Sequence, residues 1–320
     1  MSLPLVCVVI LNWNRAKDTA ECVASVLQMD YPNCRVIVVD NGSTDGTPEK
    51  LHASFPAIDV IVNATNLGFA AGNNVGIEFA LRHEAGYVFL LNNDTVVDKA
   101  LLRELVNVGE ANSQAGVLGP KIYYHDDPDR IWFVGADRNP LAFTVINWAL
   151  GKKDRGQFDQ IRKVDFICGA GMLVKREVWE RIGLLDPSYF MYYEDSDFCV
   201  RAKMAGYTLL SAPKAYMWHK VPINRQGEMS PTKVYDRARS GMRFFRKHTK
   251  GVHFGLVLLL RLGYAGYQMV VETLRGNGRI VGPYVKGLYE GLVETVPSSG
   301  NTHRGSAADA GLAEGRPWKK

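Results

Sequence analysis

Three carboxylates lie close together in the chain, at Glu194, Asp195 and Asp197, in a segment that is otherwise apolar and aromatic on both sides. A protein core does not tolerate unpaired carboxylates, because burial of the charge is costly unless the group takes up a proton. The cluster therefore lies on a solvated face, binds a cation or handles protons. A solvated face is the commonest reading of a charge run, so the other polar clusters of the chain must decide.

Polar clusters also follow three apolar, strand-like runs. They are Asn12-Trp13-Asn14-Arg15, Asp40-Asn41-Gly42-Ser43 and Asn92-Asn93-Asp94. Asn, Asp and Gly make turns, which would explain any one of them. In an open parallel sheet, however, ligands gather at the carboxyl ends of the strands. Clusters at three such ends favour a site for a polar ligand.

The elements that must position these clusters alternate along the first half of the chain. Continuous apolar runs predict buried strands over residues 5–11, 35–40, 59–62 and 87–91, and helical spacing predicts helices over 18–29, 47–54 and 73–84. This order predicts a largely parallel sheet with right-handed crossovers. Residues 124–162 read as an excursion over the sheet. A helix over 195–205, a strand over 207–211 and a basic helix over 233–248 are expected to follow it.

The polar ligand is unlike a dinucleotide, because Gly68, Gly72 and Gly76 are spaced four apart and no Walker-type loop occurs. A nucleotide diphosphate held through a metal fits better. Mg²⁺ or Mn²⁺ takes one or two protein ligands and completes its shell with phosphate oxygens and waters. Asp94 at a strand end suits that role, and a nitrogen ligand from His219 would favour Mn²⁺. A lone histidine is more often structural, so His219 depends on its surroundings.

Composition sets the class of protein and its compartment. The 320 residues are 47% hydrophobic, enough for one large α/β domain or two smaller ones. The five cysteines include no Cys-x-x-Cys pair, which favours a reducing compartment, and the first 15 residues do not resemble a secretory signal. Between residues 252 and 272 the chain is apolar but interrupted by Arg261. The longest clean run there is too short to cross a bilayer, so no membrane span is expected.

Charge is distributed unevenly along the chain. Residues 221–320 hold 16 basic and 7 acidic residues, a net charge of +9, which leaves −4 for the first 220. A basic C-terminal third suggests an anionic membrane as partner, and no motif for nucleic acid accompanies it. The basic helix and its end supply the side chains expected to dock, which are Arg237, Arg239, Arg243, Arg246, Lys247 and Lys250. Packing against the core or in a homodimer is the alternative.

Six pieces in a fixed order together resemble a known family. They are Val9–Arg15, Val38–Thr47, Asn66–Asn74, Leu90–Asp94, Gly169–Arg176 and Tyr193–Asp197. The set resembles the family 2 inverting glycosyltransferases of the GT-A fold, particularly the bacterial rhamnosyltransferase-like branch, over residues 5 to 248. Asn92 departs from the pattern, because it occupies the place of the first aspartate of the Asp-x-Asp motif. Ser240 likewise replaces the asparagine of a Tyr-x-x-x-Arg-Asn helix.

The resemblance implies a role for each matching residue. Asp195 would be the catalytic base, with Glu194 beside it, and Asp94 and His219 would bind Mg²⁺ or Mn²⁺. The nucleotide-sugar would lie among residues of the first three polar segments and the glycine-rich segment, namely Asn12, Asn14, Arg15, Asp40, Asn66, Gly68, Asn73 and Asn93. Inversion at an anomeric carbon is a single displacement that needs a general base and no protein nucleophile.

The fold implied is a Rossmann-like, mostly parallel sheet flanked by helices, with a C-terminal helical extension. We expect a catalytic domain over residues 1–248, an amphipathic helical region over 249–296 and a disordered tail over 297–320. The donor implied is dTDP-rhamnose, with UDP-sugars next, and the acceptor is a glycan or lipid-linked intermediate at the cytoplasmic face of the cell membrane. A sugar nucleotidyltransferase and an inactive nucleotide-sugar-binding protein are the alternatives.

Overall fold

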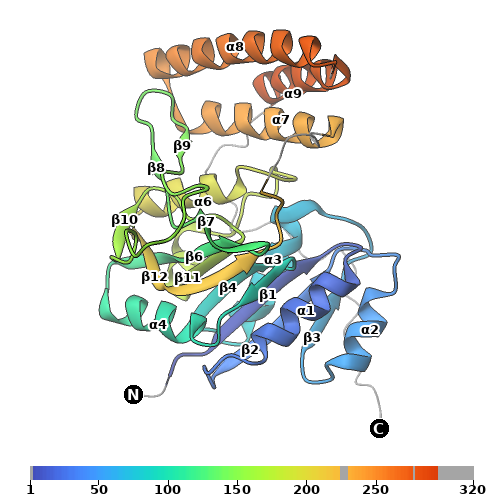
Figure 1. The fold of residues 1–320 in the computed structure, drawn as a ribbon, viewed down its shortest axis with the longest axis vertical. Coiled ribbons are helices and arrows are strands. Elements are labelled where there is room, and N and C mark those ends of the chain that lie inside the picture. Colours follow the sequence, from blue (N-terminus) through green and yellow to red (C-terminus); the bar gives the residue numbers. More distant parts are fainter. Residues whose placement is uncertain (1–2, 224–229, 277, 295–320) are drawn as a thin grey trace.

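The computed structural model describes residues 3–223, 230–276 and 278–294 (Figure 1). The strands are β1 (Val6–Asn12), β2 (Cys34–Asp40), β3 (Asp59–Val62), β4 (Tyr87–Asn92), β5 (Thr95–Val97), β6 (Ala115–Tyr124), β7 (Asp127–Phe133), β8 (Asp137–Arg138), β9 (Val145–Ile146), β10 (Arg162–Val164), β11 (Gly171–Lys175) and β12 (Thr208–His219). The helices are α1 (Ala16–Val26), α2 (Thr47–Ser54), α3 (Gly68–Arg82), α4 (Leu101–Ala111), α5 (Arg176–Ile182), α6 (Glu194–Met204), α7 (Pro231–His248), α8 (Gly251–Leu274) and α9 (Val281–Val293), with a 3₁₀ turn, η1 (Gly278–Ile280).

A mostly parallel sheet forms the centre of the molecule. Strands β4, β1, β2 and β3 are neighbours in that order and run parallel, joined by helical crossovers. The apolar runs of β4, β1 and β2 are buried on both faces, as continuous hydrophobic strands require, whereas β3 at the edge is only partly buried. Beyond β4 the sheet continues through the antiparallel strand β11 to β6 and β12, which are parallel to each other. The predicted α/β architecture and the four N-terminal strands are confirmed.

The glycines spaced four apart bring α3 close to the sheet. A Cβ at Gly76 would lie 2.4 Å from Val9, and one at Gly72 would lie 2.7 Å from Leu11. At the start of the helix, Gly68 has a φ of +81°, and a Cβ there would lie 2.5 Å from the carbonyl oxygen of Phe190. The repeat therefore packs a helix and turns a loop, which explains its departure from a dinucleotide fingerprint.

Strand β12 is longer than the sequence predicted. Its expected part ends at Ser211, but the strand continues to His219 through an irregularity between Ala212 and Tyr216. After the irregularity, residues 216–219 pair with β6, and residues 217–219 also pair with β5. His219 is therefore held on the sheet itself, directly opposite Thr95.

The excursion over residues 124–162 contains three short strands. Strand β7 pairs with β6, and β8 with β9 forms a separate two-stranded ribbon. Between β8 and β9, Phe143 stacks on Phe244 of α7 with ring centroids 5.6 Å apart. The excursion therefore joins the sheet to the C-terminal helices.

Helices α7, α8 and α9 form a layer beyond one end of the sheet (Figure 1). Helix α7 packs most extensively against α9. We expected the basic side chains of α7 to face a membrane, but most of them form ion pairs within the protein. Arg239 and Arg243 pair with Glu294, and Lys247 pairs with Asp186. The predicted tail over 297–320 lies outside the described residues.

Helix α8 is continuous over 24 residues, so Arg261 does not interrupt it. The guanidinium of Arg261 lies 4.5 Å from the ring centroid of Phe245, which lets the charge remain within an apolar helix. By length and composition alone α8 could cross a membrane, with a mean hydropathy of 1.5 and only 11% of its most apolar window buried. The prediction that Arg261 leaves the segment over residues 252–272 too short to span a bilayer is therefore wrong as far as length and composition are concerned. Its exposed apolar side chains include Val252, Leu259, Leu262, Tyr267, Val270 and Leu274.

Candidate active site

The ends of β1 and β2 are tied together by a buried polar pair. Asn12 donates from Nδ2 to Oδ1 of Asp40 over 2.7 Å, and both side chains are fully buried. The other oxygen of Asp40 accepts the backbone N–H of Ser43 at 2.8 Å. Asp40 thus orders the turn after β2. Both oxygens of Asp40 are engaged within the chain. The contact of Asp40 with a base or ribose remains a prediction.

Two more predicted nucleotide residues extend this network. Asn93 donates to Thr19 at 2.9 Å and to Oδ1 of Asn12 at 3.2 Å, which links the end of β4 to the end of β1. Asn14 has a left-handed backbone, with a φ of 52°, and accepts the backbone N–H of Thr44 at 2.8 Å. The three strand ends predicted to share a ligand therefore do lie together.

The glycine-rich segment is held by amide side chains. Asn41 donates to Oδ1 of Asn66 at 2.9 Å, and that oxygen also accepts the N–H of Gly68. Asn73 is buried and donates to the carbonyl oxygen of Phe69 at 2.8 Å. Asn41 was not predicted to have a role, but its hydrogen bonds connect this segment to the end of β2. Its position directly after Asp40 was the available signal.

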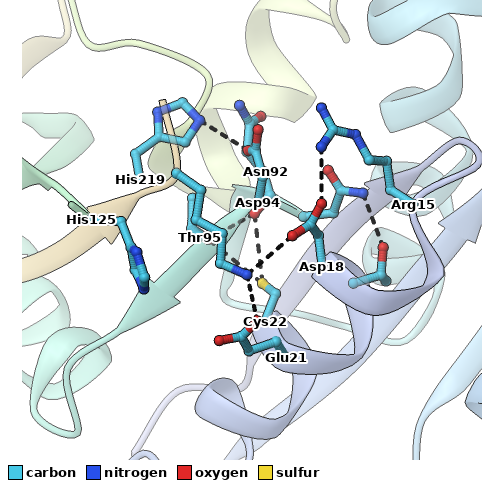
Figure 2. A network of polar contacts seen from close by, with 12 residues as sticks. Arg15, Asp18, Glu21, Cys22, Asn92, Asp94, Thr95, His125 and His219 are labelled. Atoms are coloured by element: carbon cyan, nitrogen blue, oxygen red, sulfur yellow. Dashed lines mark hydrogen bonds and ion pairs between the residues drawn. The ribbon is translucent and has the colours of Figure 1, made fainter. Parts of the chain in front are cut away.

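Two exposed side chains stand above this buried network. Trp13 is 54% exposed, and Arg15 pairs with Asp18 at 2.9 Å while remaining largely accessible (Figure 2). A solvent-facing indole supplies an apolar face for stacking, and a guanidinium supplies donors for phosphate. Of the predicted nucleotide residues, Arg15 is thus among the best placed to touch a ligand directly.

Asp94 and His219 form a pair next to these strand ends (Figure 2). The Oδ1 of Asp94 lies 2.9 Å from Nε2 of His219. Burial disfavours the charged form of Asp94, but the hydrogen bond and charge of His219, together with Arg15, hold the pKa of Asp94 below its ordinary value. Trp132 packs edge-on against the imidazole, with ring centroids 4.6 Å apart. The sequence analysis missed Trp132, which lies in the excursion.

This pair fits the ligand edge of a divalent cation. In an octahedral shell with bonds of about 2.1 Å, neighbouring ligand atoms lie about 3 Å apart, close to the observed separation. The Nδ1 of His219 is buried with no partner within the described part of the chain. No group of three or more His, Cys, Asp or Glu side chains suited to a metal occurs among the described residues. Two protein ligands leave the remaining positions to phosphate and water, as Mg²⁺ prefers.

Glu194 and Asp195 begin helix α6 and form the second acidic site. Asp195 accepts the backbone N–H of Gly169 at 3.1 Å and that of Ser196 at 2.7 Å. Burial raises the pKa of Asp195, although these hydrogen bonds oppose the shift. Burial and the neighbouring charge of Asp195 raise the pKa of Glu194 well above its ordinary value. A carboxylate with raised proton affinity is suited to accept a proton.

Asp197, the third carboxylate, is a structural residue. It is fully buried and is surrounded by three basic side chains, of which Arg201 and His248 lie at 2.7 Å and Lys247 at 2.8 Å. Burial opposes its charge, but these partners hold the pKa of Asp197 far below the ordinary value. Since Arg201 belongs to α6 and the other two to α7, Asp197 fixes the acidic helix to the C-terminal layer.

A short path of hydrogen bonds connects the two acidic sites. The N–H of Asn92 donates to the carbonyl oxygen of Ala170 at 3.1 Å, and the neighbouring Gly169 donates to Asp195. Asp195 is thereby placed beside the end of β4, from which Asn93 and Asp94 follow. A Cβ at Gly169 would lie 3.3 Å from Phe69 and 3.7 Å from the Cβ of Asp195, so this glycine allows α6 to approach.

Arg138 is a further charged residue near Asp195 that the sequence analysis did not identify. Its guanidinium lies near the rings of both Phe143 and Phe244, 4.8 and 5.0 Å from their centroids. The charge of Arg138 acts to lower the pKa of Asp195, and its NH2 is buried without a partner in the described chain. No local motif marks this residue, because its relation to Asp195 arises only when the β8–β9 ribbon packs against α7.

The chain is similar to relatives of known name. The chain is 23% identical over 272 residues to the low-salt glycan biosynthesis hexosyltransferase Agl10 of Haloferax volcanii, covering 83% of this chain and 84% of that one. It is 28% identical over 204 residues to an N-acetylglucosaminyl-diphospho-decaprenol L-rhamnosyltransferase of Mycobacterium tuberculosis, covering 58% and 66%. It is 24% identical over 250 residues to the dTDP-rhamnosyl transferase RfbF of Shigella flexneri, covering 74% and 78%.

Solved structures show the same fold. The mannosyltransferase PcManGT of Pyrobaculum calidifontis, in complex with GDP-Man and Mn²⁺, aligns with a TM-score of 0.56 and 17% identity over 92% of this chain and 88% of that one. GalNAc-T7 with UDP, GalNAc and Mn²⁺ aligns with a TM-score of 0.58 and 14% identity over 76% and 50%. The architecture is accordingly the GT-A fold. The family model described as glycosyl transferase family 2 matches residues 7–183, and the chain belongs to that family.

Proposed function

We propose that the protein is an inverting, metal-dependent glycosyltransferase. It moves a sugar from a nucleotide-diphosphate-sugar to a hydroxyl group of a glycan or lipid-linked acceptor. The observation that carries this proposal is the pairing, at one edge of the sheet, of an ionised Asp94 beside His219 with a proton-accepting Asp195. The first site suits a metal-bound diphosphate and the second suits a general base.

The displacement assigns one task to each group. The acceptor oxygen forms a bond to the anomeric carbon while the bond from that carbon to the diphosphate breaks and its electron pair leaves with the diphosphate. Asp195 takes the proton of the acceptor hydroxyl. Asp94 and His219 hold Mg²⁺ or Mn²⁺, which when bound neutralises charge on the departing diphosphate. Burial supports the proton affinity of Asp195.

The donor we propose is dTDP-rhamnose, with UDP-sugars as the next candidates. Support comes from the two relatives whose names specify rhamnosyl transfer, one of them from a dTDP-linked sugar. Trp13, exposed at the nucleotide end of the site, provides a surface for a base, and Arg15 provides a positive charge for the diphosphate. Asn12, Asp40, Asn66, Asn73 and Asn93 are proposed to shape the nucleotide pocket by the hydrogen bonds described above.

The location we propose is the cytoplasmic face of the cell membrane, with peripheral attachment. The support is the exposed apolar surface of α8 rather than the basic side chains of α7, most of which are engaged inside the protein. Apolar side chains such as Val252 and Leu259, 92% and 69% exposed, can be buried at the boundary of head groups and acyl chains.

A vesicle sedimentation assay tests this attachment. The full chain should sediment with vesicles, and Leu259→Glu combined with Leu262→Glu should release it. A matched pair of substitutions at exposed positions of the catalytic body, Val62→Glu with Leu27→Glu, should leave sedimentation unchanged. Equal sedimentation of both double variants would refute attachment through α8.

The central experiment is a transfer assay with a panel of nucleotide-sugars. With Mn²⁺ present, dTDP-rhamnose should raise the melting temperature of the protein more than UDP-sugars and should support transfer with inverted stereochemistry at the anomeric carbon. Retention of configuration would exclude the single displacement. Binding without turnover of any donor would instead indicate a protein that binds nucleotide-sugars and has lost catalysis.

A further inference from the structure

A cavity of about 540 Å³ lies among the three C-terminal helices, separate from the strand ends that form the proposed donor site. Most of its lining is apolar and comes from α7, α8, α9 and the turn after β8. Representative lining residues are Met242, Phe245, Met269, Ile280, Val281 and Leu288. The volume falls within the range of small-molecule sites, and an apolar interior of this kind favours a hydrocarbon ligand.

Charged groups in this cavity point to an anionic end on that ligand. The guanidinium groups of Arg237 and Arg261 line it, with Glu272 as the single carboxylate, and Glu272 also contacts Arg275 at 3.1 Å. Burial raises the pKa of Tyr284, and the charges of both arginines act against that shift, so both lie near this ring. An excess of guanidinium groups in an apolar setting suits a phosphate or diphosphate.

One residue of the cavity lining directly precedes the acidic site in the chain. Tyr193 lines the cavity and is also the residue directly before Glu194 and Asp195. Its ring packs on Phe244 and Phe245 of α7, with centroids 5.3 and 5.9 Å away. Tyr193 and the preceding Tyr192 both have left-handed backbones, with φ of 69° and 72°. Such a conformation is strained for tyrosine and is maintained here by the packing of its ring.

The cavity is also accessible from the apolar face of α8. Leu260 and Tyr264 line it and are nevertheless 45% and 51% exposed. These two residues therefore stand at an entrance between the outer surface of α8 and the interior. A chain inserted from that surface would extend towards Tyr193 and the start of α6.

We propose that this cavity binds the lipid chain of a phosphate- or diphosphate-linked acceptor, with Arg237 and Arg261 contacting the phosphate. This inference rests on the proposed glycosyl transfer and assigns the acceptor a site. The lipid enters between Leu260 and Tyr264, and the sugar that it carries is directed past Tyr193 to Asp195. An acceptor bound in this way presents its hydroxyl to the base while its chain remains in an apolar environment.

Cavity-filling variants of the full chain test the proposal. Thr144→Trp and Met269→Trp place an indole in the cavity from opposite sides, and Val270→Trp adds the same group at a neighbouring, 60% exposed position of α8 as the control. Two acceptors carry the same diphosphate-linked sugar on a long or a short isoprenoid chain. The filling variants should raise the KM for the long-chain acceptor about tenfold and remove its advantage over the short-chain one. The control should retain that advantage.

A binding assay separates this inference from the proposed function. Long-chain polyprenyl phosphate should bind the full chain, and both filling variants should weaken its binding about tenfold. Arg237→Gln and Arg261→Gln should weaken polyprenyl phosphate binding but not binding of the uncharged polyprenol, and Arg279→Gln, on the exposed turn η1, should affect neither. Transfer that proceeds with equal chain-length preference in wild type and filling variants would overturn the lipid site and leave glycosyl transfer intact. Lipid binding that the fillers block, without transfer to either acceptor, would refute the proposed function alone.

Other occupants of the cavity give distinct outcomes. If phosphatidylglycerol displaces polyprenyl phosphate at equal concentration, the cavity holds a bilayer lipid and the acceptor assignment is wrong. If the filling variants instead change the molar mass of the protein in solution, a second copy of the chain occupies the region. Near-native circular dichroism and an unchanged Kd for the nucleotide-sugar confirm that each variant is folded.

Discussion

Asp94 and Asp195 lie at the same edge of the sheet, yet their surroundings shift their pKa values in opposite directions. Burial disfavours the charged form of both aspartates. Asp94 has His219 within hydrogen-bonding distance and remains ionised, whereas the hydrogen bonds that Asp195 accepts within the described residues come from backbone N–H groups. Two aspartates at one edge of the sheet can therefore serve a metal and a proton separately, as a displacement with a diphosphate leaving group requires.

Asp197 supplies the contrast within helix α6. Two residues from Asp195 on the same helix, it is held ionised by three basic partners and is fully buried. The three carboxylates found together in the sequence thus divide into a proton-handling pair and a structural anion. Position along the helix decides the division, because Asp197 faces α7 and Asp195 faces Gly169.

Replacement of Asp195 by asparagine should have the largest effect on activity. The amide keeps the shape but cannot accept the acceptor proton, so we expect transfer to fall by about 10²- to 10⁴-fold. The Kd for the nucleotide-sugar should stay within a few-fold of wild type, since the donor contacts other residues. Steady-state transfer rates and donor titration measure both quantities, and near-normal turnover would show that Asp195 is not the base.

Asp197→Asn should lower stability rather than remove the base. Loss of a buried anion with three basic partners should reduce the free energy of unfolding by about 3 to 5 kcal/mol. The pKa of Asp197 in the folded chain lies below its ordinary value of 3.8, so its contribution is present above pH 3.8 and is lost as the pH falls towards the folded value. Denaturant unfolding at pH 7 and pH 3.5 measures this. The difference between wild type and variant should shrink at the lower pH, and a constant difference would refute the charge-based account.

Asp94→Ala tests whether Asp94, unlike Asp195, acts through a metal ion. Transfer should fall about a hundredfold, as when one preorganised electrostatic contact is removed. Calorimetric titration with the nucleoside diphosphate should show weaker binding in Mn²⁺ and unchanged binding in EDTA. Equal weakening under both conditions would mean that Asp94 contacts the nucleotide without a metal.

The nucleotide end of this site could be predicted because its residues follow strands with strong local signals. Apolar runs of five to seven residues located β1, β2 and β4, and the parallel order then required Asn12, Asp40 and Asn93 to meet. Local sequence could not show that Asp40 would be fully buried with both oxygens engaged. That depends on the turn at Ser43, whose N–H reaches back to the carboxylate.

The C-terminal layer was harder to predict because its charges act through tertiary contacts. Arg239 and Arg243 appear in the sequence as part of a solvent-facing basic helix, but Glu294, some fifty residues away, neutralises them. Arg261 appears as a break in an apolar segment, but Phe245 accommodates it. Arg138 likewise has no local motif and acquires its relation to Asp195 only when the β8–β9 ribbon packs against α7.

The smallest expected effect is a shift in the pH dependence of transfer. As the pH falls, Asp195 becomes protonated and transfer should decrease. Because the pKa of Asp195 is raised, the midpoint of this acid limb should lie above pH 3.8. Arg138→Gln removes a positive charge that lowers this pKa, so the acid limb of the kcat profile should move to higher pH. Glu194→Gln should move the limb less, because the raised pKa of Glu194 keeps that carboxyl group protonated and uncharged over the acid limb. Asp94→Ala should change the height of the profile more than the position of this limb. An acid limb that Arg138→Gln leaves in place or moves to lower pH would show that this charge does not act on the base, and the electrostatic contrast between the two acidic sites would then fail.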